Sequence, residues 1–177
     1  LMCINFCTEI HQALRAKEPI DLLFLIFRMV LSKSFGYALR GVLYVSLMND
    51  ERRKIRIEEI AAALGVPRHF LGKIMKQVVK AGIISSTRGQ QGGFYINEQT
   101  LQTPLEKIIL LTEGEAYFTT CMLSMRPCNA ADPCPLHNRL YGFKTEMREF
   151  YRQTTIADLL QTDKPQFIHS LSVHLAV

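Results

Sequence analysis

The run from Ile57 to Gly82 constrains the fold more than any other stretch, because its apolar residues twice follow the period of an α-helix. Between the two periodic segments, Gly65 can take the left-handed conformation that ends a helix, and Pro67 fits the first turn of the next one. Two short helices joined by a tight turn are typical of a helix-turn-helix, although any helical hairpin could give the same pattern.

The second predicted helix has an apolar face and a basic face. The side chains expected to point inward are those of Phe70, Leu71, Ile74 and Val78. Those expected outside belong to Arg68, His69, Lys73, Lys76, Gln77 and Lys80. The second helix of such a pair can enter the major groove of DNA, so four of the outer side chains are candidate DNA contacts. They are Arg68, His69, Lys73 and Lys76.

A β-hairpin is predicted directly after the second helix. Residues 83–87 and 94–97 are expected to form its strands, and the glycine-rich run 88–93 its turn. A hairpin at this place corresponds to the wing of a winged helix, whereas an ordinary hairpin would leave its Arg in solvent. Arg88 and Gly89, near the tip, are further candidate DNA contacts, because a planar cation can enter a minor groove or clamp a phosphate.

Positive charge is concentrated in this same region. Residues 52–88 contain nine Lys or Arg and two Glu, which gives a local formal charge of +7. The whole chain carries only +5, so the remainder is net negative by two charges. Such a distribution favours a polyanionic partner, with double-stranded DNA as the first candidate, although a solvated basic face would look alike.

Three further helices are predicted around this region. Apolar residues recur at three to four positions from Ser34 to Met48. Thr103 to Glu106 has the form of a capping box with Pro at the first helical position, so a helix is expected from there to about Leu111. Thr155 is expected to cap a short helix from Ile156 to Leu160.

A heptad pattern follows near Pro135. Its members, spaced alternately by four and three residues, are Leu136, Leu140, Phe143, Met147, Phe150 and Thr154. Such a stripe could pack on its own domain. Because the winged helix already has a core, we favour a seam shared with a second copy of the chain, which predicts a homodimer.

Three cysteines and one histidine fall within the seventeen-residue window from Cys121 to His137. The gaps are six residues from Cys121 to Cys128, five from Cys128 to Cys134, and two from Cys134 to His137. The window belongs to a stretch, Thr112 to Cys134, without a convincing period, which is expected to be a long loop. Four soft or borderline ligands this close together can converge on one metal centre.

Thiolates with a histidine suit either zinc or an iron-sulfur cluster. The gaps of six and five residues fit poorly with the two to four typical of zinc knuckles, whereas a larger cluster tolerates them. Three alternatives stay open, a regulator with a zinc site, a regulator with a metal-free thiol switch, and an iron-sulfur electron carrier. The carrier, however, has no need of a helix-turn-helix.

Composition narrows the class of protein. Nearly half of the 177 residues are apolar, which indicates a globular chain. Five cysteines without a preceding signal peptide argue against a disulfide framework and for a reducing cytoplasm. The apolar run from Ile20 to Phe27 is too short to span a bilayer. No phosphate loop, triad or paired-carboxylate pattern is visible, so we expect neither enzyme activity nor a small-molecule substrate.

Several motifs in one order give the chain a family resemblance. They are SFGYALRGVLYVSL, IEEIAAALGVPRHFLGKIMKQVVKAGII, STRGQQGGF, TPLEKII, the cysteine window and TIADLL. From about Leu31 to Leu160 the chain thereby resembles the winged-helix regulators of the IscR, NsrR and CymR superfamily. The resemblance implies a mainly α fold with a small β-hairpin wing, and a long C-terminal dimerisation helix.

The resemblance also implies a cofactor. In iron-sulfur members three loop cysteines are ligands, which match Cys121, Cys128 and Cys134, and in the regulator IscR a histidine matching His137 completes the site. A [2Fe–2S] cluster is favoured over a [4Fe–4S] cluster. This chain departs from the family in three places. The first gap is one residue longer than usual, Gly36 replaces a carboxylate ligand of nitric-oxide sensors, and Gly72 replaces an acidic base-reading residue.

These expectations divide the chain into five parts. Residues 1–28 form an N-terminal extension, 29–111 the winged helix-turn-helix domain, 112–134 a sensor loop, 135–164 the dimerisation helix with a short last helix, and 165–177 a tail. The predicted function is that of a dimeric transcription regulator whose operator binding is controlled by an iron-sulfur cluster.

Overall fold

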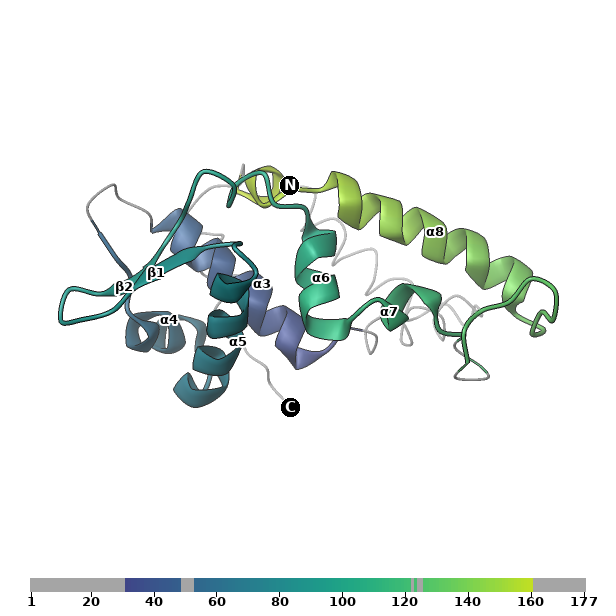
Figure 1. Cartoon of the computed structure of the whole chain (residues 1–177), viewed down its shortest axis with the longest axis horizontal. Helices are drawn as coiled ribbons and strands as arrows, with labels where there is room; N and C mark the ends of the chain where they lie inside the picture. The colour runs from purple at the N-terminus through teal and green to yellow at the C-terminus, as the bar shows by residue number, and fades with distance from the viewer. Residues whose placement is uncertain (1–30, 49–52, 122, 124–125, 161–177) are drawn as a thin grey trace, which may run out of the picture. The chain divides into compact units, whose positions relative to one another are not determined.

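The computed structural model of the protein describes residues 31–48, 53–121, 123 and 126–160. The expected N-terminal extension and tail lie outside the described residues. The described elements belong to one unit that begins at Lys33, and they are mostly helical with a two-stranded antiparallel hairpin (Figure 1). This confirms the predicted fold class. In chain order they are α3 (Lys33–Leu47), α4 (Ile57–Leu64), α5 (Arg68–Lys80), β1 (Ser85–Thr87), β2 (Gly93–Tyr95), α6 (Leu105–Glu113), α7 (Ala116–Thr119), α8 (His137–Gln153) and α9 (Ile156–Leu159).

The helix-turn-helix forms as predicted. Gly65 ends α4 with a φ of 63°, and the amide of Val66 closes the turn on the carbonyl of Ala61 at 3.1 Å. Pro67 is the N-cap of α5, where its missing N–H costs no hydrogen bond.

The inward face of α5 differs from the prediction at one residue. Leu71, Ile74, Met75 and Val78 are buried, whereas Phe70 is 51% exposed. The buried residues follow the i, i+3, i+4, i+7 stripe of a helix. At about 100° per residue, Phe70 lies roughly 90° from the centre of that stripe. The prediction that Phe70 points inward is therefore wrong, and Met75 fills the core in its place.

Helix α3 forms the centre of the core, where it packs against α4, α5 and α6. Ala38, Val42 and Val45 are fully buried on this helix. Gly41 allows α5 to come close, because a Cβ there would lie 2.6 Å from the sulfur of Met75. The close contact of α3 with α5 thus depends on the absence of a side chain at Gly41.

The wing is tied to the helix-turn-helix by a third segment. β1 and β2 pair with Ser86 opposite Phe94, and Phe94 also exchanges two backbone hydrogen bonds with Ile55, of 2.8 and 2.9 Å. The strands are shorter than predicted, since Ile83 and Ile84 are buried in the core below the hairpin. Strand β2 is therefore held by backbone hydrogen bonds on both edges, to β1 on one side and to Ile55 on the other.

Gly93→Ala is expected to destabilise the wing. A Cβ at Gly93 would come within 2.7 Å of the backbone of Ile55, and backbone cannot move aside as a flexible side chain can. Overpacking of this kind costs about 1–3 kcal/mol in the free energy of unfolding. Urea denaturation followed by circular dichroism measures it.

The matched control is Gly72→Ala, at a half-buried position of α5. Its Cβ would meet only Ile57 Cγ1, at an ordinary 3.9 Å. Because glycine within a helix is unfavourable relative to alanine, this change is expected to stabilise the fold by about 0.5–1 kcal/mol. Equal effects of the two substitutions would contradict the backbone contact at Gly93.

The predicted capping box at Thr103 does not form. The N-cap of α6 is Pro104, the hydroxyl of Thr103 donates to the carbonyl of Gln99, and Glu106 bonds to Arg148 of α8 instead. The carboxylate of Glu106 thus forms an ion pair with a distant residue instead of the local hydrogen bond that a capping box needs.

The capping box at Thr155 is present, with Asp158 as its partner. Next to it, Leu105 donates to Thr154 at 2.9 Å and Ile156 donates to Thr103 at 3.0 Å. Backbone hydrogen bonds therefore join the residues after α8 to the residues at the start of α6.

No helix among the described residues is both long and apolar enough to cross a membrane.

Candidate metal centre and nucleic-acid interface

The stretch 112–134 is only partly the loop that was expected. α6 continues to Glu113, Gly114 turns the chain with a φ of 76°, and the short helix α7 follows. The apolar residues of this stretch show no clear helical period, because α7 is about one turn long and buries only one side chain, that of Phe118.

After α7 the backbone pairs with itself and brings two cysteines together. The amide of Cys121 donates to the carbonyl of Arg126 at 2.7 Å, and that of Cys128 donates to Thr119 at 2.8 Å. Thr120 lies opposite Pro127 in an antiparallel bridge. We call these paired segments, 119–121 and 126–128, the cysteine hairpin.

The other two candidate ligands lie where α8 begins. The amide of His137 donates to the carbonyl of Cys134 at 2.9 Å, which forms the turn that leads into the helix. The side chain of His137 is only 7% exposed and that of Cys121 only 6%, whereas Cys128 and Cys134 are half-buried. A helix start favours negative charge nearby, such as that of thiolates.

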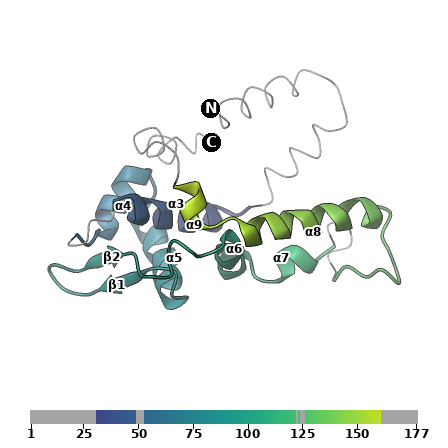
Figure 2. The same cartoon turned by 90° about the horizontal axis from the view of Figure 1, so that it is seen from above.

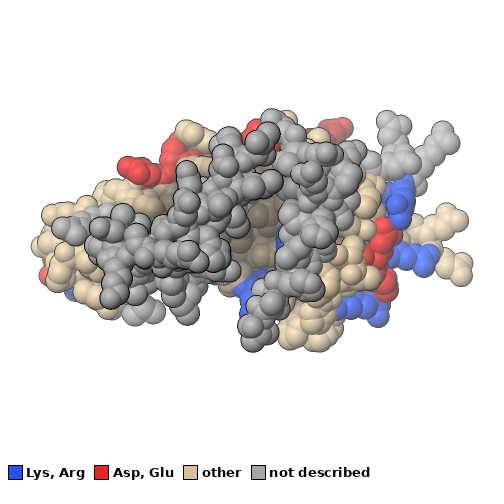
Figure 3. Space-filling view, turned by 180° about the vertical axis from the view of Figure 1, so that it is seen from behind, with Lys and Arg blue, Asp and Glu red and all other residues tan. Residues whose placement is uncertain are grey.

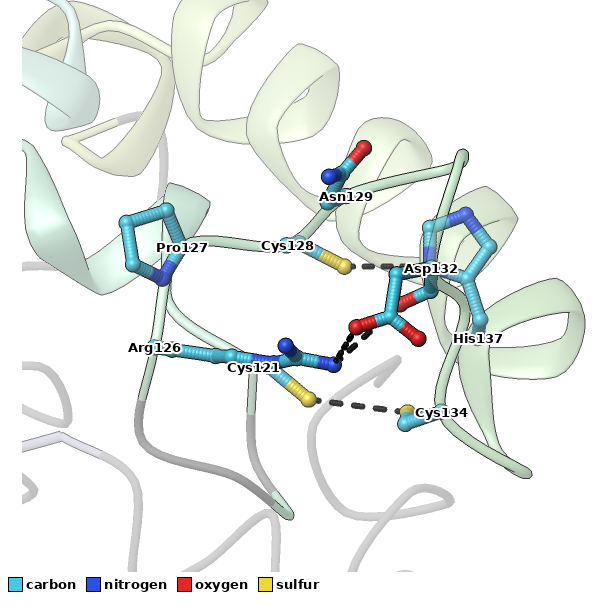
Figure 4. A pocket seen from close by; sticks show the side chains of 8 residues that line it. All are labelled: Cys121, Arg126, Pro127, Cys128, Asn129, Asp132, Cys134 and His137. Atoms are coloured by element: carbon cyan, nitrogen blue, oxygen red, sulfur yellow. Dashed lines mark hydrogen bonds and ion pairs between the residues drawn. The ribbon is translucent and has the colours of Figure 1, made fainter.

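The four candidate ligands face one another as two pairs that cross between these elements. Cys121 Sγ lies 3.5 Å from Cys134 Sγ, and Cys128 Sγ lies 3.2 Å from His137 Nδ1 (Figure 4). Each pair joins one thiol of the cysteine hairpin to one donor at the start of α8. All four side chains line one pocket.

Within each pair, the separation of the two donors is close to that of two ligands on one tetrahedral metal. Two ligands of one tetrahedral metal lie about 3.8 Å apart for two sulfurs and about 3.5 Å apart for sulfur and nitrogen. The observed separations differ from these by about 0.3 Å. Among the described residues, however, no group of three or more His, Cys, Asp or Glu side chains is arranged around a single ion.

Two cations frame this pocket. Arg126 pairs with Asp132 at 2.6 Å across its outer wall (Figure 4). On the inner side, Lys144 of α8 donates to the carbonyl of Thr120, next to Cys121. Lys144 thereby joins α8 to the cysteine hairpin.

One stripe of α8 packs against its own chain, beside α6 and α7 (Figures 1 and 2). His137, Lys144, Arg148 and Tyr151 belong to this stripe. The predicted heptad seam is a different stripe. Leu136 is 40%, Phe143 39% and Phe150 58% exposed within this single chain.

Arg148 is the main polar link between α8 and the rest of the fold. Its Nε lies 2.6 Å from Glu106 of α6, and its second nitrogen lies 2.9 Å from Glu115, just before α7. The guanidinium also stacks over Phe118, with 4.9 Å to the ring centroid. The hydrogen bond to Glu106 raises the pKa of Arg148, so the cation is held firmly.

Arg148→Met is expected to lower the free energy of unfolding by about 1–2 kcal/mol, since exposed ion pairs contribute little each and the ring contact adds to them. The matched control is Arg152→Met. Arg152 pairs with Glu149 at 2.7 Å within the same helix and in solvent, so its loss is expected to change the free energy of unfolding much less. Chemical denaturation compares the two. Similar losses would contradict a tertiary role for Arg148.

The candidate DNA contacts lie on two neighbouring elements. Arg68, His69, Lys73 and Lys76 are exposed on α5, and Arg88 and Gly89 are exposed on the wing. Arg68 also pairs with Glu58 of α4 at 2.5 Å. In Figure 3, Lys and Arg side chains, with acidic side chains between them, lie on the right of the view, where the winged helix is.

Sequence reasoning missed three residues of these sites. Arg56 donates to the carbonyl of Gln90 and so holds the wing tip, while Lys144 and Arg148 join α8 to the cysteine hairpin and to α6. Their partners lie 24 to 42 residues away along the chain. No local period or motif signals such contacts.

Comparison with known proteins gives this architecture a family. The profile of the Rrf2 family, described as iron-dependent transcriptional regulators, matches residues 31–162. A putative HTH-type transcriptional regulator of Aquifex aeolicus is 33% identical over 139 residues, which are 77% of this chain and 94% of that protein. The HTH-type transcriptional regulator NsrR of Geobacillus kaustophilus is 28% identical over 134 residues, 75% of this chain and 90% of that one.

Solved structures agree in fold. The global cysteine regulator CymR of B. subtilis matches 75% of this chain and 98% of its own, with a TM-score of 0.63 and 19% identity. IscR of T. potens matches 74% of this chain and 85% of its own, with a TM-score of 0.58 and 20% identity. With the winged helix, the cysteine hairpin and the family profile all in place, the chain belongs to the Rrf2 family of transcriptional regulators.

Proposed function

We propose that the protein is a dimeric DNA-binding regulator whose operator binding depends on an iron-sulfur cluster held by Cys121, Cys128, Cys134 and His137. The observation that carries this proposal is the crossing of the two donor pairs, at 3.5 and 3.2 Å, between the cysteine hairpin and the start of α8.

The donor set fits a binuclear cluster best. A [2Fe–2S] cluster needs two protein ligands on each iron, which matches two separate pairs. Cys121 and Cys134 would hold one iron, and Cys128 and His137 the other. A structural zinc ion would need all four donors around one point, and it is the alternative metal for this donor set. When bound, the cluster would supply a redox-active centre with one exchangeable imidazole ligand.

Holding both pairs would cross-link two elements of the chain. The cysteine hairpin follows α6, which packs on α3 and α5, and the short helix α7, while α8 carries the proposed dimer seam. Fixing the hairpin against the start of α8 would therefore set how each winged helix is held relative to the seam. In a two-fold dimer this determines the separation of the two α5 helices, and so which operator half-sites they match.

The DNA partner follows from the basic residues of α5 and the wing. Lys73, Lys76 and Arg88 are exposed, so their side chains are suited to contact phosphates. Arg56 donates to the carbonyl of Gln90 and so holds the wing. A DNA-binding protein with reduced thiols is suited to the cytoplasm.

One observation favours a second candidate, a metal-free thiol switch. The sulfurs of Cys121 and Cys134 are 3.5 Å apart, close enough to form a disulfide of about 2.05 Å after a small shift. Oxidation would then cross-link the same two elements without a metal.

Anaerobic purification followed by iron, sulfide and absorption analysis separates these candidates. The proposed function predicts two irons and two sulfides per chain, visible absorption, and salt-dependent affinity for double-stranded DNA that changes when the cluster is removed. A colourless protein with reversible thiol oxidation would support the second candidate. A loaded protein without affinity for DNA would contradict a regulator.

A further inference from the structure

Phe70 is an exposed aromatic residue on the predicted DNA-reading helix. It is the third residue of α5 and is 51% exposed. The other large apolar side chains exposed among the described residues lie on α8 or at the cysteine hairpin and the turn into α8. A single exposed ring needs no explanation in general, so its surroundings decide whether it has a role.

The surroundings of Phe70 are polar and basic. Its ring lies against that of His69, with 4.2 Å between centroids and a tilt of 40°. Lys73 and Gln77 share its side of α5 at i+3 and i+7, and both are exposed. The ring is thus an apolar spot at the edge of a basic surface. A polyanion that also presents apolar groups complements such a surface, whereas an apolar protein surface would leave the cations without partners.

We propose that Phe70 reads thymine by contact with its 5-methyl group in the major groove. This inference rests on the proposed DNA binding by α5. A phenyl ring has no hydrogen-bond donor or acceptor, and the thymine methyl is the apolar group on the major-groove edge of the base pairs.

The proposal gives this helix a reading rule that differs from an acidic one. Gly72 offers no carboxylate to accept from a cytosine amino group, so discrimination on this part of α5 comes from an apolar contact. The expected signature is one thymine in each half-site that matters through its methyl group rather than through its hydrogen bonds.

Uracil substitution tests this directly, because uracil differs from thymine only by the missing methyl. Preferred duplexes are first selected from a random pool with the full-length wild-type protein. Each thymine in the selected half-site is then replaced by uracil, and affinities are measured at one salt concentration. Since burial of a methyl group contributes about 0.8 kcal/mol, one replacement is expected to weaken wild-type binding about fourfold.

Variants assign the effect to Phe70. Phe70→Ala is expected to bind the thymine and uracil duplexes equally, and Phe70→Leu to keep part of the difference. Because Phe70 is half exposed, both variants are expected to fold, which circular dichroism verifies. The control Lys76→Ala is expected to weaken both duplexes alike and to keep the fourfold ratio, since Lys76 is assigned to phosphates.

Two results would overturn the proposal. One is a wild-type protein that binds thymine and uracil duplexes equally at every position, which is also the outcome expected if Phe70 docks another protein. The other is a Phe70→Ala variant that keeps the wild-type ratio. If the wild-type protein selects no sequence from the random pool, the proposed operator binding is wrong, and the thymine contact falls with it. If it selects a sequence but does not distinguish thymine from uracil, only the thymine contact is wrong.

Discussion

Cys128→Ala is expected to abolish cluster binding and to remove the dependence of DNA affinity on iron. The substitution deletes one donor of the pair in which Cys128 Sγ lies 3.2 Å from His137 Nδ1. It leaves that metal position with a single protein ligand, which does not hold an iron. Iron and sulfide content after anaerobic reconstitution, together with DNA titrations before and after cluster removal, measures both effects.

The matched control is Cys7→Ser, which removes a thiol outside the window and is expected to leave two irons per chain. The backbone of Cys128 stays paired with Thr119 in the variant, so the cysteine hairpin is expected to remain folded. If Cys128→Ala leaves DNA affinity and site preference unchanged with and without iron, the proposed coupling is wrong.

Phe150→Glu is expected to convert the dimer to a monomer and to reduce operator affinity by about 100-fold or more, because a monomer engages one half-site at a time. Phe150 is 58% exposed in the single chain and lies on the predicted seam. A two-fold seam contains every substitution twice, so the change places two negative charges in an apolar interface, where they lose their contact with water. Sedimentation and DNA titration at one salt concentration measure the two effects.

Thr145→Glu provides the matched control, since it adds the same charge to α8 on another, exposed face of the helix. It is expected to leave the dimer intact. A Phe150→Glu protein that stays dimeric would show that the seam is not the interface, and a monomer with wild-type affinity would show that DNA binding does not need two copies.

Sequence by itself determined the winged helix and the identity of the candidate ligands. Helical period, the left-handed turn at Gly65 and the start of α5 after Pro67 depend on residues within a few positions of one another. The same holds for the helix cap at Thr155, which forms as predicted. Local patterns of this kind are visible in the sequence because the physical interactions behind them are local.

Only the tertiary structure decided what depends on distant partners. Glu106 leaves its expected capping box for Arg148, because an ion pair between α6 and α8 competes with a local bond. Phe70 is exposed, because the stripe that faces α3 is centred on its neighbours. The pairing of Cys121 with Cys134, and of Cys128 with His137, depends on how the cysteine hairpin lies against α8. The spacing in the sequence identified the four candidate donors. The packing of α8 against the cysteine hairpin decided which of them lie close together.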